Sequence, residues 1–129
     1  MKLFVAVTML FSVSVHAACW TVEGVKGSSY SEREGYSRID DGFKGKFTIV
    51  IDGERAAVLY DGLDAGGMIY RPFSDNVVLG LTTEPGKHAM ETWVIQKDGT
   101  VLMTKTISGF GGLNSSKAMI GKVTGNCLK

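Results

Sequence analysis

The two cysteines constrain the fold of this 129-residue chain more than any other feature of its sequence. Cys19 and Cys127 lie near the two ends of the predicted mature domain, and in an oxidising compartment they are expected to form one disulfide. The fold must then bring the first element of the domain next to the last. Such a bridge stabilises a domain by roughly 4 to 5 kcal/mol through the lost entropy of the unfolded chain. It also removes both thiols from the candidate nucleophiles and metal ligands.

The N-terminal segment 1–17 has the three parts of a secretory signal peptide. A basic residue, Lys2, is followed by an apolar run over 3–15 and by a small residue, Ala17, after which cleavage is predicted. The apolar run is shorter than the about 20 residues that a membrane-spanning helix requires, so no membrane span is expected. The sequence therefore predicts a single domain over 18–129 that is periplasmic or secreted.

Lipidation of Cys19 is the alternative to the disulfide. Bacterial lipoproteins carry an aliphatic residue three positions before the lipidated cysteine, whereas this chain has His16 there. Lipidation would also leave Cys127 unpaired in an oxidising space. The disulfide is therefore the favoured fate of both thiols.

The charges of the predicted mature domain balance and are mixed along the chain. The whole chain has 14 basic and 13 acidic residues, and the loss of Lys2 with the signal peptide leaves 13 of each. No run of five like charges occurs. This distribution predicts no basic patch that would bind nucleic acid or an anionic membrane surface.

Two Asp-Gly pairs, at 52–53 and 98–99, each separate two runs that are rich in β-branched and aromatic residues. Such runs are typical of strands, and Asp-Gly readily adopts the positive φ angles of a type I′ turn. The sequence therefore predicts two β-hairpins. Their expected strands cover 45–52, 54–61, 89–97 and 100–108.

A third hairpin is expected between these two, around a turn at Ser74-Asp75. One of its strands contains Pro72, which lacks a backbone N–H, so that strand is expected to lie at a sheet edge. The segment 29–37 is expected to form a short helix or an ordered loop. The remaining expected strands cover 19–25, 68–73, 76–82 and 117–127.

Eight short strands joined by tight turns predict an all-β fold over 18–129, built as an antiparallel up-and-down β-barrel. Closure removes the exposed edges of an open sheet and places the first and last strands side by side, as the disulfide requires. A two-sheet β-sandwich is the alternative. The expected barrel is similar to lipocalins in architecture, but the chain lacks their G-x-W signature, so no residue role follows from the likeness.

Alternation places Phe47, Ile49 and Ile51 on one face of their predicted strand, and Trp93 with Ile95 on one face of theirs. An eight-stranded barrel is near the size at which the interior is either filled or holds one small molecule. These residues are therefore expected to form either a packed core or the wall of a ligand cavity.

The predicted mature domain has few groups for catalysis. His88 is its single histidine, and no G-x-S-x-G motif occurs, so neither a triad hydrolase nor a metal site is predicted. Carboxylate chemistry would have to use one of three acidic pairs, which are of the kind that form solvated turns: Asp40 with Asp41, Asp61 with Asp64, or Glu32 with Glu34. We therefore expect no enzyme and no cofactor.

A glycine-rich stretch over 109–117 is the candidate binding loop. Phe110 and Leu113 would offer apolar contacts on a flexible frame at the mouth of a barrel, with Asn114 beside them. The stretch is not a phosphate-binding Walker loop, because Ser116 rather than glycine precedes Lys117.

These observations favour a small exported protein that binds another protein of the envelope or exterior without catalysis, such as an inhibitor, an immunity-type protein or an accessory factor. The first alternative is a carrier of a small apolar ligand inside the barrel. The second alternative is a weak hydrolase that works through carboxylates.

Overall fold

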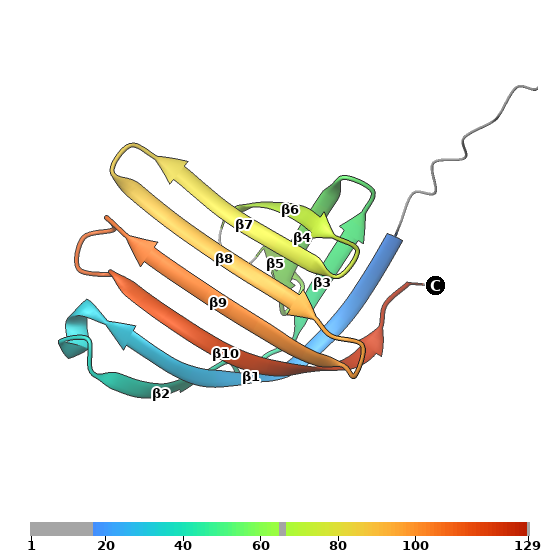
Figure 1. Cartoon of the computed structure of the whole chain (residues 1–129), viewed down its shortest axis with the longest axis horizontal. Helices are drawn as coiled ribbons and strands as arrows, with labels where there is room; N and C mark the ends of the chain where they lie inside the picture. Colours follow the sequence, from blue (N-terminus) through green and yellow to red (C-terminus); the bar gives the residue numbers. More distant parts are fainter. Residues whose placement is uncertain (1–16, 65–66, 129) are drawn as a thin grey trace, which may run out of the picture.

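A computed structural model of the protein describes residues 17–64 and 67–128. These residues form one antiparallel sheet that curls strongly into a half-barrel (Figure 1). A 3-10 helix, η1 (Glu32–Glu34), lies at one rim. The strands are β1 (Ala17–Ser31), β2 (Arg38–Gly42), β3 (Phe47–Asp52), β4 (Arg55–Tyr60), β5 (Leu63–Asp64), β6 (Ile69–Ser74), β7 (Val77–Glu84), β8 (Lys87–Ile95), β9 (Thr100–Ser108) and β10 (Ser115–Asn126).

The predicted signal peptide lies outside the described residues except for Ala17. Among residues 17–64 and 67–128, no helix has the length and hydropathy needed to cross a membrane.

The disulfide between Cys19 and Cys127 is confirmed, with the two Cα atoms 5.0 Å apart. The backbone N–H of Cys127 also donates a hydrogen bond of 3.0 Å to the carbonyl oxygen of Cys19. The bridge closes one end of a long antiparallel ladder between β1 and β10, which runs from Trp20 opposite Asn126 to Ser31 opposite Ser115. The first and last strands are therefore neighbours, as expected.

The prediction of a closed eight-stranded barrel is wrong, because the sheet stays open between β4 and β6. The strand order is β5-β4-β3-β1-β10-β9-β8-β7-β6, with β2 paired to β1 beside this path, so neither the strand count nor the closure matches. All these strands belong to one sheet, so the two-sheet β-sandwich is wrong as well.

The open seam has a local cause in the strands that border it. β4 and β6 contact each other without a hydrogen-bonded ladder, and the intervening β5 is two residues long. β6 carries Pro72, which has no N–H to donate, and its ladder with β7 shifts register between Pro72 and Ser74. The expectation that the strand of Pro72 lies at a sheet edge is confirmed.

The predicted hairpins are present, but their turns are not of type I′. In the β3–β4 hairpin Asp52 still pairs with Arg55, and Gly53 alone has a positive φ of 61°, which is typical of a type II′ turn. In the β8–β9 hairpin Gly99 has a φ of 86° after a tight turn, and its N–H bonds to the carbonyl of Gln96 at 3.0 Å. This is the arrangement of a longer loop with a glycine bulge.

β1 is longer than predicted and pairs with two different strands along the same edge. It bends at Gly24, which has a φ of 64°, and its ladder with β10 shifts register between Glu23 and Lys26. Before the bend β1 pairs with β3, and after the bend it pairs with β2. The expected helix or loop over 29–37 is thus the end of β1 followed by η1.

The hydrophobic core lies on the concave side of the sheet. Phe47, Ile49, Ile51, Trp93 and Ile95 are all buried, which confirms their predicted place on inner faces. The ring centroids of Phe47 and Trp93 are 4.8 Å apart. The core continues through the inner residues Val22, Val25, Val58, Val78, Val101, Met103 and Met119.

Removal of the disulfide tests how far the β1–β10 tie stabilises the domain. The double substitution Cys19→Ser and Cys127→Ser is expected to lower the free energy of unfolding by about 2 to 5 kcal/mol, since the cross-link restricts the unfolded chain. Urea denaturation followed by circular dichroism measures the change. Reductant should destabilise the wild type by a similar amount and leave the double variant unaffected. An unchanged midpoint in the variant would contradict this role.

Candidate functional site

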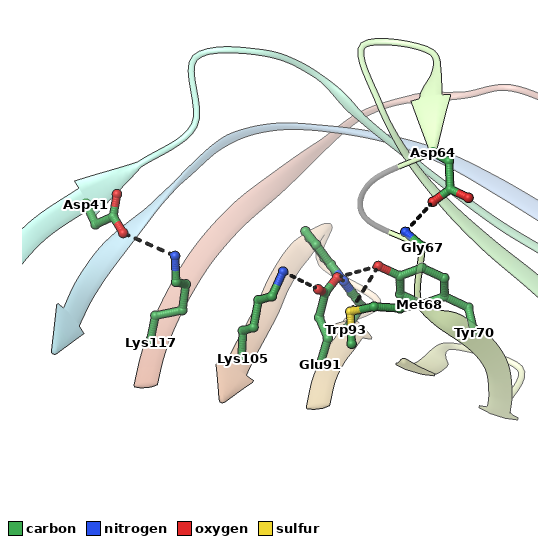
Figure 2. Close-up of polar contacts among 9 residues, drawn as sticks. All are labelled: Asp41, Asp64, Gly67, Met68, Tyr70, Glu91, Trp93, Lys105 and Lys117. Atoms are coloured by element: carbon green, nitrogen blue, oxygen red, sulfur yellow. Dashed lines mark hydrogen bonds and ion pairs between the residues drawn. The ribbon is translucent and has the colours of Figure 1, made fainter. Parts of the chain in front are cut away.

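A row of polar side chains crosses the inner face of the sheet, next to the hydrophobic core (Figure 2). Residues that stand directly opposite each other on neighbouring antiparallel strands point to the same face of the sheet. The ladders align one such residue on each of six neighbouring strands, in the order β1, β10, β9, β8, β7 and β6. This inner row consists of Ser29, Lys117, Lys105, Glu91, Gly80 and Tyr70.

Glu91 is the most deeply buried charged residue described, at 3% exposed. Its Oε1 accepts hydrogen bonds from the hydroxyl of Tyr70, at 3.1 Å, and from the indole Nε1 of Trp93. Its Oε2 lies 3.3 Å from Nζ of Lys105. A buried carboxylate is tolerated only when it is paired and hydrogen-bonded. Three donors from β6, β8 and β9 meet this requirement and fix the position of the carboxylate.

Gly80 makes room for the ring of Tyr70. A Cβ atom on Gly80 would lie 2.6 Å from Cε1 of Tyr70, a distance that would displace the ring. The hydroxyl of Tyr70 also lies 3.8 Å from Sδ of Met68. Burial, reinforced by the adjacent Glu91 carboxylate, raises the pKa of Tyr70, so its hydroxyl stays protonated and donates.

Lys105 and Lys117 stand directly opposite each other on β9 and β10. Lys105 is paired with Glu91 on one side, and Nζ of Lys117 lies 3.4 Å from Oδ2 of Asp41 on the other. Nζ of Lys117 is also 5.7 Å from the ring centroid of Phe43. The charges across the face therefore follow the order acid, base, base, acid, with the two ammonium groups in the middle (Figure 2).

Asp41 is the outer member of this order and comes from β2. Partial burial acts to raise the pKa of Asp41, but the N–H of Gly42, the charge of Lys117 and the hydroxyl of Ser29 outweigh it. The net effect is a pKa below the ordinary value, so Asp41 is ionised at neutral pH.

Two open hollows adjoin the inner row and share Lys105. The first, which we call the rim hollow, has a volume of about 420 Å³ and lies beside the glycine-rich loop that carries Phe110 and Leu113. Its main lining residues are Met68, Ala89, Lys105, Ile107, Phe110 and Leu113. The second, the seam hollow, has a volume of about 380 Å³ and includes Phe43, Leu63, Glu91, Met103 and Lys105. Both hollows therefore open beside core residues, Met68 and Ala89 in the rim hollow and Met103 in the seam hollow.

A larger depression, of about 990 Å³, lies elsewhere, over the bend of β1. Its lining includes Lys26, Arg38 and Asp40, and the last two form a solvent-exposed ion pair. Exposed charges of both signs are well hydrated and give little binding energy. We therefore place the candidate site on the concave side.

The structure brings two of the three predicted loop residues into the rim hollow. Phe110 is half-buried against the core, and Leu113, at 45% exposed, lines the same hollow. Asn114 instead supports the loop, because its Oδ1 accepts a hydrogen bond of 2.8 Å from Gly109 N–H. Its carbonyl oxygen also accepts one of 2.8 Å from Glu32 N–H, which ties the loop to η1.

The carboxylates considered for hydrolysis do not form one cluster. Asp40 lies beside Arg38, while Oδ1 of Asp61 accepts a hydrogen bond of 2.8 Å from Lys46 N–H. Oδ1 of Asp64 accepts one of 3.2 Å from Gly67 N–H. Across the described ranges, no three His, Cys, Asp or Glu residues are grouped so that they could hold a metal ion.

Glu91, Lys105 and Tyr70 were not predicted as site residues. A signal for the first two is present in the sequence, because each interrupts an inward apolar alternation. Glu91 stands between Ala89 and Trp93 on β8, and Lys105 stands at the equivalent position on β9. A charged residue at an inward strand position needs a buried partner, and this is the pattern that marks the site.

Comparison with protein families, with curated proteins and with solved structures found no match for this chain.

Substitution of Gly80 tests the packing that positions Tyr70. Gly80→Ala is expected to destabilise the domain by about 1 to 3 kcal/mol, because the added methyl group overlaps the tyrosine ring. Gly125→Ala is the matched control, since a Cβ there would lie 3.8 Å from its nearest neighbour, Thr21. Thermal or urea unfolding of the two variants measures the difference. Equal stability of both would show that Tyr70 does not need the space above Gly80.

The pH dependence of stability tests the pair of Asp41 and Lys117. A carboxyl group with a lowered folded-state pKa stabilises the fold above its ordinary value of 3.8, and this contribution is lost as the pH falls through the folded value. Asp41→Asn is therefore expected to cost about 1 kcal/mol or less at neutral pH and nothing at strongly acidic pH. Unfolding curves at several pH values measure this, with Asp40→Asn as the control. A difference that persists unchanged in acid would contradict the ionic origin.

Proposed function

We propose that this protein is a non-enzymatic binding protein that holds a small, largely apolar molecule in the rim hollow. The observation that carries the proposal is that Phe110 and Leu113, from the glycine-rich loop, line the same open hollow as Met68 and Ile107. Its volume of about 420 Å³ lies within the range of about 300 to 1,000 Å³ that is usual for small-molecule sites.

The architecture supports such a site. The rim hollow opens at the edge of the core, because the core residues Met68 and Ala89 also line it. The disulfide and the long β1–β10 ladder hold the curved sheet in one shape. A site that is already shaped before binding loses less conformational entropy when the ligand enters. The disulfide is also compatible with the expected periplasmic or secreted location.

Binding of another protein is the second candidate function, and the outer face favours it. Ile69, Leu81 and Met90 stand opposite one another on β6, β7 and β8, with exposed fractions of 63%, 46% and 54%. Neighbouring exposed apolar side chains on one sheet face are typical of protein interaction surfaces. A carboxylate hydrolase gains no such support, because its candidate residues are dispersed.

A neutral fluorescent probe tests the proposed site. N-phenylnaphthylamine is expected to bind the wild type saturably, and the double substitution Phe110→Ala and Leu113→Ala is expected to weaken binding by about tenfold or more, since apolar contact area is lost. Leu81→Ala on the outer face is the control and should leave the affinity unchanged. Circular dichroism verifies that the variants fold. Loss of binding in Leu81→Ala alone would move the site to the outer face and contradict the proposal.

A further inference from the structure

The two lysines at the centre of the inner row, Lys105 and Lys117, each have one carboxylate partner and yet stand directly opposite each other. Like charges directly opposite each other on neighbouring strands destabilise a sheet. Lys105 and Lys117 occupy such positions on the inner face, with side chains 21% and 19% exposed. Glu91 requires only one cation as its partner, and Lys105 supplies it. Lys117 on β10 places a second positive charge opposite Lys105. The pair therefore calls for an explanation beyond the folding of the sheet.

The carboxylates lie on the outer sides of the pair. Glu91 approaches Lys105 from β8, and Asp41 approaches Lys117 from β2, on opposite flanks (Figure 2). Each ammonium group has three N–H donors, and within the described part of the chain each has one carboxylate partner. Donors therefore remain available in the space between Lys105 and Lys117, where a single acceptor group could bond to both.

We propose that the ligand is an amphipathic anion whose negatively charged head group bridges Lys105 and Lys117 while its apolar part lies in the rim hollow. This inference rests on the proposed function, because the rim hollow supplies the apolar half of the site. Lys105 lines the hollow together with Ile107 and Phe110, so an apolar chain attached to a head group at Lys105 can lie against the loop.

The arrangement selects against other head groups. A cationic head would meet two ammonium groups, and Glu91 is already occupied by three donors. A neutral head would gain no charge-assisted hydrogen bond to either ammonium group. An anion forms charge-assisted hydrogen bonds in a partly buried site, where screening by water is weak. A carboxylate or a sulfate on an apolar chain has the required chemistry.

Calorimetric titration with three probes tests the inference. Decanoate has both the head and the chain, decanol has only the chain, and acetate has only the anionic head. For the wild type we expect decanoate to bind at least about tenfold more tightly than either of the other two, and the advantage over decanol to shrink as salt is added.

Variants at the lysines locate the head group. Lys117→Met is expected to weaken decanoate binding by about tenfold and to leave decanol binding unchanged, since one charge-assisted contact is lost. Its former partner, Asp41, is 32% exposed and can be hydrated, so the variant is expected to fold. Lys105→Arg keeps the cation that Glu91 needs and should retain the preference for decanoate. Lys122→Met, on the exposed side of the same strand, is the matched control and should behave as the wild type.

The outcomes separate this inference from the proposed function. Equal affinities for decanoate and decanol, with no effect of Lys117→Met, would overturn the head-group site and leave the binding function intact. Acetate binding as tight as decanoate binding would show a site for free anions and overturn the amphipathic ligand. Binding of neither decanoate nor decanol by the wild type would overturn the proposed function itself.

Discussion

The antiparallel ladder between β1 and β10, closed at one end by the Cys19–Cys127 disulfide, fixes where every other strand lies. It joins the ends of the chain in the middle of the sheet, with β3 and β4 on one side and β9 to β6 on the other. Both sides curl toward the same concave face, and the bend of β1 at Gly24 adds β2 to the wall. The opening therefore falls in the middle of the sequence, between β4 and β6, rather than between the termini.

The concave side carries both an apolar core and a row of polar side chains. Toward the disulfide end, residues such as Trp93 and Phe47 pack into a closed apolar core. Two residues before Trp93 on β8, Glu91 belongs to the polar row. Two residues before Glu91, Ala89 lines the rim hollow. A buried carboxylate held by three donors, beside two opposed lysines, would be costly as mere packing. The same groups are well suited to recognise a ligand that is apolar at one end and anionic at the other.

The sequence allowed the hairpins to be predicted because their signals are local: glycine at the turn and alternating apolar residues on both sides. Closure was mispredicted although Pro72 already marked β6 as an edge strand. The two-residue length of β5 and the register shift in β6 also keep β4 and β6 from pairing, and no local pattern shows either of them. β2 was missed because its sequence, with Asp40 and Asp41, reads as a turn. For the site, Phe110 and Leu113 were found from loop composition. Glu91 and Lys105 acquire meaning only when the register of β8 and β9 brings them together.

The central claim is that the ligand lies on the concave side, and the methionines can report this directly. Met68 lines the rim hollow, whereas Met90 is exposed on the outer face of β8. NMR spectra of isotope-labelled methionine methyl groups, recorded during titration with N-phenylnaphthylamine, place the bound molecule next to one or the other. The account predicts that the Met68 signal shifts saturably while the Met90 signal stays in place. A shift of Met90 with no change at Met68 would contradict it.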